Sequence, residues 1–322
     1  MSDVEPGSSL ALELRGLEKA YRIGHLRPVK RPILKGLDLA VPRGGIFGYL
    51  GPNGSGKTTT LKLVVGLLRA DAGTVTVLGL PASSRDWRYR VGYLPENPYL
   101  YDYLTAREYL EYVGRLFGLP AAERSSRAGR LLREVGMERS ADVALRRVSK
   151  GMLQRVGIAQ ALVNDPELVI LDEPMSGLDP IGRHMVRQMI LRLKDAGKTI
   201  FFSTHILSDA EVLCDRVAML RDGRVVTAGR LDEILAPDVA HMEVLVGGLE
   251  PRHLAELRDA LHVRPVGERA LLHVPEASLA EVVRTVQQAR GRILSVQPAR
   301  QSLEEIFVRE TGPSAGGGVW ED

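Results

Sequence analysis

Cysteine is nearly absent from this sequence: Cys214 is the only one in 322 residues, so the chain cannot form an internal disulfide. This fits a reducing compartment such as the cytoplasm. Cys214 lies in an apolar stretch, which favours a buried, inert thiol over a reactive one. Long apolar runs are also missing, since none approaches the roughly 20 residues of a membrane helix, and the N-terminus lacks a signal-peptide pattern. Any role at a membrane is therefore expected to come through a partner.

The chain also lacks a large excess of charge of either sign. The chain has 43 Lys and Arg residues against 40 Asp and Glu residues, which gives a net charge of +3. So small an excess implies no polyanion-binding surface, and we expect no nucleic-acid partner. A hydrophobic content of 44% and a charged content of 26% are ordinary for a soluble globular protein. The length suggests about two domains.

The most informative run that is present is rich in glycine. It consists of Gly51, Pro52, Asn53, Gly54, Ser55, Gly56, Lys57 and Thr58. This run matches the phosphate-binding P-loop pattern G-x-x-x-x-G-K-[ST] at every fixed position. A strand-like apolar segment (46–50) precedes it and a segment with helical spacing (61–68) follows it, as the pattern requires. The glycines let backbone N–H groups surround phosphate oxygens, and the helix directs its positive end at the same anion.

The side chains of this loop predict the ligand. Lys57 is expected to reach the β- and γ-phosphates, and the Thr58 hydroxyl to hold Mg²⁺. Thr59 is expected to be a further nucleotide contact. The loop therefore indicates a nucleotide di- or triphosphate with magnesium.

A second nucleotide feature is a buried strand pattern (167–171) that leads into two carboxylates, Asp172 and Glu173. In a doubly wound sheet this strand end lies beside the P-loop. We expect Asp172 to bind Mg²⁺ directly or through water, and Glu173 to polarise the water that attacks the γ-phosphate. The alternative is a strand that merely ends in a turn at Pro174.

The order of elements predicts an α/β fold with a parallel sheet at its centre, because strand and helix patterns alternate. Two further strands form an antiparallel edge sheet, joined by a surface loop over 22–32, and two amphipathic helices form an insertion. A hairpin at Asp222-Gly223 closes this domain near residue 235. The strand patterns are 10–14, 33–41, 167–171, 199–203, 217–220 and 225–227; the helical patterns are 105–116, 127–135, 178–193 and 207–214.

The remaining residues predict a small ferredoxin-like α+β domain with the order β-α-β-β-α-β. Ser278 is expected to cap one of its helices in a capping box with Glu281. Its strand patterns are 241–246, 263–266, 270–274 and 293–297, and its helical patterns are 252–261, 278–289 and 302–308. We therefore expect a flexible N-terminus (1–9), a nucleotide-binding domain (10–235, with its helical subdomain at about 97–163), an accessory domain (236–310) and a flexible tail (311–322).

Further motifs carry a family resemblance. The run Ser149-Lys150-Gly151-Met152-Leu153-Gln154-Arg155 opens a helical pattern and resembles the L-S-G-G-Q signature of ATP-binding cassette (ABC) ATPases. Ser176-Gly177-Leu178-Asp179 resembles their D-loop, and His205 resembles their switch histidine. Tyr21 stands where the family stacks an aromatic side chain on adenine. The resemblance covers residues 10–235, and the sequence is identified as a member of this family.

The resemblance implies the P-loop ABC ATPase fold and a site shared by two subunits. In this family ATP joins two cassettes, and the signature helix faces the γ-phosphate that the opposite subunit holds. Glu173, His205 and Lys57 are then the catalytic residues. The nucleotide-binding residues from the signature and D-loop are Ser149, Gly151, Met152 and Asp179. The implied partners are a second ABC ATPase subunit, as a homodimer or heterodimer, and a separate transmembrane permease.

Three positions depart from the family pattern. Lys150 replaces the first glycine of the signature pair and puts a cation near phosphate, while Met152 replaces the glutamine. Glu96 stands where the Q-loop usually has glutamine, and it can ligate Mg²⁺ but can donate a hydrogen bond only when protonated. Together with the run Ser302-Leu303-Glu304-Glu305-Ile306-Phe307, these variants look like the export-type branch of the family.

Seven of the nine tyrosines lie between Tyr89 and Tyr112. Tyrosine clusters are typical of protein interfaces. Tyr109 and Tyr112 have helical spacing and are equally well explained as core residues. The loop tyrosines are better interface candidates, and in the ABC architecture this region receives the coupling helix of the membrane subunit. We expect the docking groove to be lined by Tyr99, Tyr101 and Tyr103.

The leading function hypothesis is an ATPase subunit that powers a membrane exporter from the cytoplasmic face of the inner (plasma) membrane. The alternative is a soluble ABC ATPase acting on nucleic acid or ribosomes, which a single cassette, no long heptad run and near-neutral charge disfavour. A regulatory nucleotide sensor is disfavoured because the catalytic residues are all present. The transported substrate is open, because in this family specificity lies mainly in the membrane subunit.

Overall fold

The computed structural model describes residues 10–24, 29–236, 238–249, 253, 262–267, 269–299 and 302–311. These residues divide into two compact units, the first ending at Leu231 and the second beginning at Asp232. Within the described ranges, every helix is too short or too polar to cross a bilayer. The predicted flexible N-terminus (1–9), the helix at 252–261 except His253, and the tail from 312 onward lie outside the described residues.

A six-stranded sheet forms the centre of the first unit, in the order β10-β9-β3-β8-β7-β6. All neighbours from β9 to β6 are parallel, and β10 returns antiparallel to β9 after the predicted Asp222-Gly223 turn. All five residues of β7 are buried, as expected for a strand inside a parallel sheet. The strands are β3 (Gly45–Leu50), β6 (Val91–Leu94), β7 (Leu168–Asp172), β8 (Thr199–Thr204), β9 (Arg216–Arg221) and β10 (Arg224–Arg230).

A second, antiparallel sheet has the order β2-β1-β4-β5. Its strands are β1 (Leu10–Ile23), β2 (Val29–Pro42), β4 (Ala72–Val77) and β5 (Leu80–Pro81). The predicted surface loop over 22–32 was wrong, because Arg31 and Pro32 pair with β1. Pro32 is tolerated because β2 is an edge strand and the register of its ladder shifts at this point.

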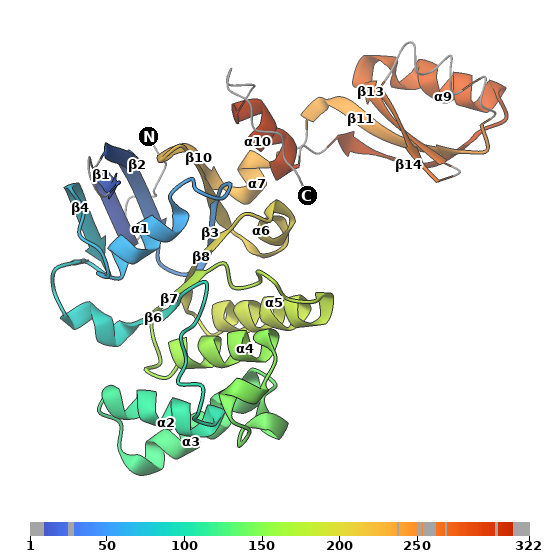
Figure 1. Ribbon diagram of the computed structural model, residues 1–322. Helices are drawn as coiled ribbons and strands as arrows, with labels where there is room; N and C mark the ends of the chain where they lie inside the picture. Colours follow the sequence, from blue (N-terminus) through green and yellow to red (C-terminus); the bar gives the residue numbers. More distant parts are fainter. Residues whose placement is uncertain are drawn as a thin grey trace. The chain divides into compact units, whose positions relative to one another are not determined.

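The helices of the first unit separate into two groups (Figure 1). Helix α1 packs in the core shared by the two sheets, where Leu61 joins Leu14 of β1 and Phe201 of β8 in one buried cluster. Helices α2, α3 and α4 contact one another and form the predicted helical insertion. The helices are α1 (Lys57–Val64), α2 (Ala106–Leu116), α3 (Ala121–Glu134), α4 (Lys150–Ala161), α5 (Pro180–Asp195) and α6 (Leu207–Leu213), with 3₁₀ turns η1 (Asp86–Arg90), η2 (Glu138–Ser140) and η3 (Leu145–Arg147). The short helix α7 (Leu231–Ile234) includes the last residue of the first unit and the first three residues of the second.

The second unit is α+β. Its antiparallel sheet has the order β12-β13-β11-β14, and Val286 of α9 packs with Val244 and Leu272 of the sheet. The predicted cap at Ser278 was wrong: Ser278 has helical dihedral angles, ends η4 and accepts no capping hydrogen bond. Ser302 and Glu305 instead form a reciprocal capping pair for α10. The elements are β11 (Asp238–Gly247), β12 (His262–Val266), β13 (Arg269–Pro275), η4 (Glu276–Ser278), α9 (Leu279–Gln288), β14 (Arg292–Ala299) and α10 (Leu303–Thr311).

Candidate functional site

The phosphate-binding loop joins β3 to α1. Two of its positions require glycine, each for a different structural reason. Gly56 precedes α1 with a φ of 112°, which residues with a Cβ rarely adopt. A Cβ on Gly51 would lie 2.4 Å from the carbonyl oxygen of Leu220 on β9. The loop is therefore shaped by its own backbone and by the close approach of β9.

Lys57, Glu173 and His205 lie together at the end of the central sheet. Lys57 is buried, and its Nζ donates to the carbonyl oxygens of Gly51 at 2.7 Å and Pro52 at 3.2 Å. Glu173 Oε1 lies 3.3 Å from the same Nζ, and Glu173 Oε2 lies 2.9 Å from His205 Nδ1. Glu173 also has a φ of 48°, a strained conformation for a residue with a side chain. The structure thus places this carboxylate between the side chains of Lys57 and His205, the two other predicted catalytic residues.

Ser203 on β8 connects the two carboxylates. Its hydroxyl donates to Asp172 Oδ1 at 2.6 Å and accepts from the backbone N–H of Glu173 at 3.0 Å. The Thr58 hydroxyl donates to the same oxygen of Asp172 at 3.3 Å. The sequence reasoning missed Ser203, whose only signal was its position two residues before His205. The contact depends on the parallel register, which pairs Asp172 with Ser203.

The environment of Asp172 is that of a metal ligand. Burial raises the pKa of Asp172 above its ordinary value, against the hydrogen bonds from Ser203 and Thr58, and the charges of Glu96 and Glu173 raise it further. Its Oδ2 is buried and accepts no hydrogen bond from any residue that the structure describes. A partnerless carboxylate oxygen beside a hydroxyl fits Mg²⁺, which takes oxygen ligands. Within the described ranges no group of three or more His, Cys, Asp or Glu side chains could hold a metal ion.

The phosphate-binding loop borders a cavity of about 530 Å³, and Asp172 and Ser203 are not among its lining residues. The predicted loop residues that line it are Asn53, Gly54, Gly56, Lys57, Thr58 and Thr59. Glu96, Glu173 and His205 also line it, together with the unpredicted Ile33 and Ser176. Tyr21 is not among the lining residues and pairs with Arg31 in the β1–β2 ladder. Ser55 is buried, and its hydroxyl has no partner.

Ser176 is the one residue of the predicted D-loop run that lines this cavity, whereas the predicted binding residues of the signature and Asp179 of the D-loop are not among its lining residues. Ser149 is the N-cap of α4 and accepts from the N–H of Met152 at 3.3 Å. Asp179 is the N-cap of α5 and accepts from the N–H of Gly182 at 2.8 Å. Both cap residues are exposed, whereas Gly151 is half-buried. Within one chain, these residues are not brought to the phosphate-binding loop.

Lys150 contacts the D-loop. Its side chain is exposed, and a Cβ on Gly177 would lie 2.9 Å from Lys150 Nζ. The lysine that replaces a signature glycine therefore places its ammonium group against the D-loop backbone.

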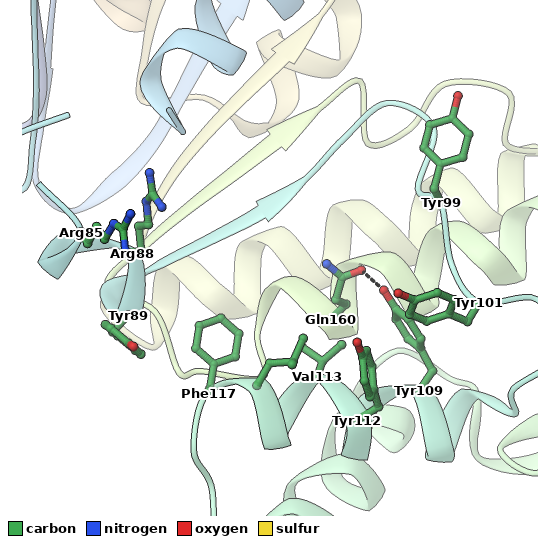
Figure 2. Close-up of a pocket in the computed structure, with 11 residues that line it drawn as sticks. Arg85, Arg88, Tyr89, Tyr99, Tyr101, Tyr109, Tyr112, Val113, Phe117 and Gln160 are labelled. Atoms are coloured by element: carbon green, nitrogen blue, oxygen red, sulfur yellow. Dashed lines mark hydrogen bonds between the residues drawn. The ribbon is translucent and has the colours of Figure 1, made fainter. Parts of the chain in front are cut away.

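A separate groove of about 740 Å³, here the aromatic groove, lies between η1, α2 and the loop after β6 (Figure 2). Tyr99 and Tyr101 line it, whereas Tyr103 is exposed but is not among its lining residues, so the groove is not lined by all three tyrosines of the predicted docking surface. Tyr109 is buried and Tyr112 is 39% exposed, and both contribute to the groove. Further lining residues that the sequence reasoning missed are Arg85, Arg88, Tyr89, Leu116 and Phe117.

Cys214 is buried, in agreement with the prediction from its apolar surroundings. Burial raises the pKa of its thiol well above the ordinary value, with a further contribution from the charge of Asp215. The thiol is therefore protonated and shielded at neutral pH.

Known proteins resemble this chain over most of its length. A family model described as "ABC transporter" matches residues 34–176. An uncharacterized ABC transporter ATP-binding protein of Synechocystis sp. is 45% identical over 313 residues, which cover 95% of this chain and 86% of the relative. The Nod factor export ATP-binding protein I of Ralstonia nicotianae is 36% identical over 315 residues, 95% of each chain.

Solved structures also resemble a large part of this chain. An ATP-binding subunit of an ABC transporter has 36% identity and a TM-score of 0.61, covering 70% of this chain and 91% of its own. A dimeric ATP-binding cassette in a post-hydrolysis state, bound to ADP and Pi, has 28% identity and a TM-score of 0.63. That match covers 68% of this chain and 98% of the other. The α/β cassette fold predicted from the motifs is confirmed.

Proposed function

This chain belongs to the ABC transporter ATP-binding proteins, and we propose that it hydrolyses ATP as the cytoplasmic ATPase subunit of a membrane exporter. The observation that carries this proposal is the position of Glu173 between Lys57 and His205, beside the phosphate-binding loop. In the proposal, residues 10–235 form the nucleotide-binding domain and 236–310 an accessory domain.

ATP binding uses the cavity beside the loop. The backbone N–H groups of the loop and the N-terminus of α1 stabilise the phosphates. Lys57 Nζ exchanges its hydrogen bonds with the carbonyl groups of Gly51 and Pro52 for the β- and γ-phosphates. Because Lys57 also neutralises Glu173, this exchange frees the carboxylate for a new partner. Tyr21 remains the candidate for stacking on adenine, although it does not line the cavity.

Three oxygen-bearing side chains would hold Mg²⁺: Thr58, Asp172 and Glu96. Asp172 offers its unpartnered Oδ2, while Ser203 keeps Oδ1 in place. The ion neutralises charge on the phosphates when bound. The pKa of Asp172 is raised because burial disfavours its charged form, and a nearby cation would stabilise that charged form.

Glu173 acts as the general base for hydrolysis. A water beside the γ-phosphate donates a hydrogen bond to the Glu173 carboxylate, which takes the proton as the water oxygen bonds to the γ-phosphorus. The bond between that phosphorus and the β,γ-bridging oxygen breaks, and ADP leaves with the bridging oxygen and its electron pair. His205, already within hydrogen-bond distance of Glu173 Oε2, orients the carboxylate and contacts the γ-phosphate. The strained backbone of Glu173 and its hydrogen bond to Ser203 hold this base at one position.

A second cassette completes the site. Ser149, Gly151 and Met152 lie at the start of α4, and the N-terminus of a helix with an exposed hydroxyl can bind phosphate. In the proposal they face the γ-phosphate bound by the other subunit, and Asp179 links the two sites. The dimeric cassette among the similar structures supports this arrangement for a homodimer or heterodimer.

The exporter role rests on relatives and on the aromatic groove. Several relatives with 34–37% identity are Nod factor export ATP-binding proteins, which supports export over import. In the proposal a transmembrane permease docks near Tyr99, Tyr101 and Tyr103, at the cytoplasmic face of the inner membrane. The alternative of a soluble ATPase acting on nucleic acid or ribosomes is not favoured, because these relatives are transporter subunits.

Partner-dependent hydrolysis tests the proposal. The ATPase rate of the full chain is measured for the chain alone, in proteoliposomes with a candidate transmembrane subunit, and with nucleic acid or ribosomes. We expect stimulation by the transmembrane subunit only, with Lys57→Ala as the inactive control. Stimulation by nucleic acid or ribosomes instead would replace the exporter with the alternative.

A further inference from the structure

The hydroxyl of Tyr93 on β6 is buried and has no hydrogen-bond partner among the residues that the structure describes. Asp172 Oδ2, at the end of the neighbouring strand β7, is in the same situation. A buried polar group without a partner destabilises the folded state, and such groups are rare in native proteins. The proposed magnesium site accounts for the carboxylate oxygen, but it leaves the hydroxyl of Tyr93 unexplained.

Tyr93 and Asp172 lie on the same face of the central sheet. The parallel register of β6 and β7 pairs Tyr93 with Ile170. Side chains at the same level of adjacent strands point to one face, and so do side chains two residues apart in one strand. This face is the one that α1 covers, because Ile170 and Leu61 of α1 lie in one buried cluster against which Tyr93 packs. Thr58 of α1 reaches Asp172 from the same side.

The Tyr93 hydroxyl lies within the electrostatic range of Asp172. Burial raises the pKa of Tyr93, and the charge of Asp172 raises it further. The two residues stand two levels apart in the sheet, which is about 6.6 Å along the strand direction, a separation that a tyrosine side chain can span. The hydroxyl is therefore protonated at neutral pH and near the carboxylate without being hydrogen-bonded to it.

A group between the hydroxyl and the carboxylate would satisfy both atoms. In the proposed function Asp172 Oδ2 faces Mg²⁺, and Mg²⁺ in protein sites usually keeps several water ligands. Because the oxygen of such a water is bound to the metal, the water only donates hydrogen bonds. A protonated phenol can accept one of them. The raised pKa of Tyr93 disfavours the phenolate that direct metal ligation would require.

We propose that the Tyr93 hydroxyl is a positioning group of the nucleotide site, which accepts a hydrogen bond from a water ligand of the Mg²⁺ that Asp172 holds. This rests on the proposed function, because it takes the cavity beside the phosphate-binding loop to bind a nucleotide with Mg²⁺. The hydroxyl is unsatisfied in the free protein and gains its partner only with the metal. It therefore favours the metal-bound state over the free state.

The variant Tyr93→Phe removes the hydroxyl and keeps the ring. Tyr49→Phe is the matched control, because Tyr49 is buried on β3 and its hydroxyl already pairs with Thr60 Oγ1 at 3.1 Å. Without nucleotide and metal, Tyr93→Phe should unfold at a urea midpoint equal to or above that of the wild type, since it loses no hydrogen bond. Tyr49→Phe should unfold at a lower midpoint, since it loses one.

Metal affinity is the readout that a purely structural role of Tyr93 would not change. The probe is Mn²⁺, which takes the same octahedral oxygen ligands as Mg²⁺. Mn²⁺ is titrated into the complex of the protein with ADP, and the free ion is counted by electron paramagnetic resonance. Tyr93→Phe should bind Mn²⁺ about threefold to tenfold more weakly, the effect of losing one hydrogen bond. The ADP affinity of Tyr93→Phe in EDTA and the Mn²⁺ affinity of Tyr49→Phe should stay at the wild-type values.

Two results overturn the proposal. One is a wild-type Mn²⁺ affinity in Tyr93→Phe. The other is a loss of stability in free Tyr93→Phe as large as that in Tyr49→Phe, because the hydroxyl would then already have a partner. In both cases ATP hydrolysis by the wild-type protein leaves the proposed function intact. A wild-type protein that neither binds Mn²⁺ with ADP nor hydrolyses ATP rejects the proposed function, and the role of Tyr93 with it.

Discussion

The variant Ser203→Ala tests how much the Ser203 hydroxyl stabilises the folded protein. The side chain is fully buried, and alanine keeps its Cβ while removing both hydrogen bonds of the hydroxyl. Asp172 Oδ1 then loses a donor at 2.6 Å, and the Glu173 N–H loses its acceptor at 3.0 Å. The first bond involves a charged group, and the second leaves a buried donor unsatisfied.

The loss of stability in Ser203→Ala follows from the two hydrogen bonds that the variant removes. A hydrogen bond to a charged group contributes about 1.5–3 kcal/mol, and an unsatisfied buried donor costs about 1–3 kcal/mol. The variant should therefore lose about 2.5–6 kcal/mol of unfolding free energy. Thr204→Val is the matched control, because its buried hydroxyl accepts a single neutral bond from the Ile206 N–H at 3.0 Å. Its loss should be about 1–2 kcal/mol.

Urea unfolding measures both values, with the fluorescence of buried Trp87 as the probe in a Trp320→Phe background. The Ser203 bond lowers the pKa of Asp172, so it stabilises the ionised form. Its contribution is present while Asp172 is charged and declines as the pH falls and the carboxylate takes up a proton. The difference in unfolding free energy between wild type and Ser203→Ala should therefore become smaller as the pH is lowered. Equal stability of Ser203→Ala and wild type at neutral pH would refute this reasoning.

Three further predictions concern packing, the signature and docking. Gly92→Ala should destabilise the first unit by about 3 kcal/mol or more, because its Cβ would lie 1.8 Å from the carbonyl oxygen of Ala161; Gly129→Ala, with nothing closer than 3.8 Å, should be neutral or stabilising in thermal unfolding. Lys150→Gly should leave nucleotide binding by the isolated chain unchanged. It should weaken ATP-dependent dimerisation several-fold in analytical ultracentrifugation. Unchanged dimerisation would show that the Lys150 ammonium group does not contribute to the shared site. The triple alanine variant of Tyr99, Tyr101 and Tyr103 should lose co-purification with the transmembrane subunit at normal partner-free ATPase, and wild-type co-purification would remove these tyrosines from docking.

The phosphate-binding loop and the carboxylates could be predicted because each lies within one short segment. The strand β3, the loop and α1 are continuous in sequence, so the pattern contains its own structural context. Asp172 and Glu173 follow a fully apolar strand, and such a strand belongs inside a parallel sheet. Their neighbourhood with Lys57 then follows from the topology of parallel α/β sheets.

Contacts that depend on register or on distant segments could not be predicted. Ser203 reaches Asp172 only because β7 and β8 pair at that residue, and no local pattern specifies this register. The extension of β2 through Pro32 depends on its edge position, which is a property of the whole sheet. The aromatic groove is lined by residues of η1, α2 and the loop after β6. The cluster of tyrosines could be recognised in the sequence, but the position of Arg85 and Arg88 beside it could not.

The central claim is that Glu173 is the base of an ATPase site, and hydrolysis by Glu173→Gln tests it most directly. The variant keeps the size of the side chain but cannot accept the proton, so the rate should fall about 10²–10⁴-fold, while ATP-bound dimers accumulate in light scattering. Glu167→Gln, an exposed carboxylate just before the start of the same strand, is the control and should hydrolyse ATP at the wild-type rate. Turnover by Glu173→Gln at the wild-type rate would contradict the account.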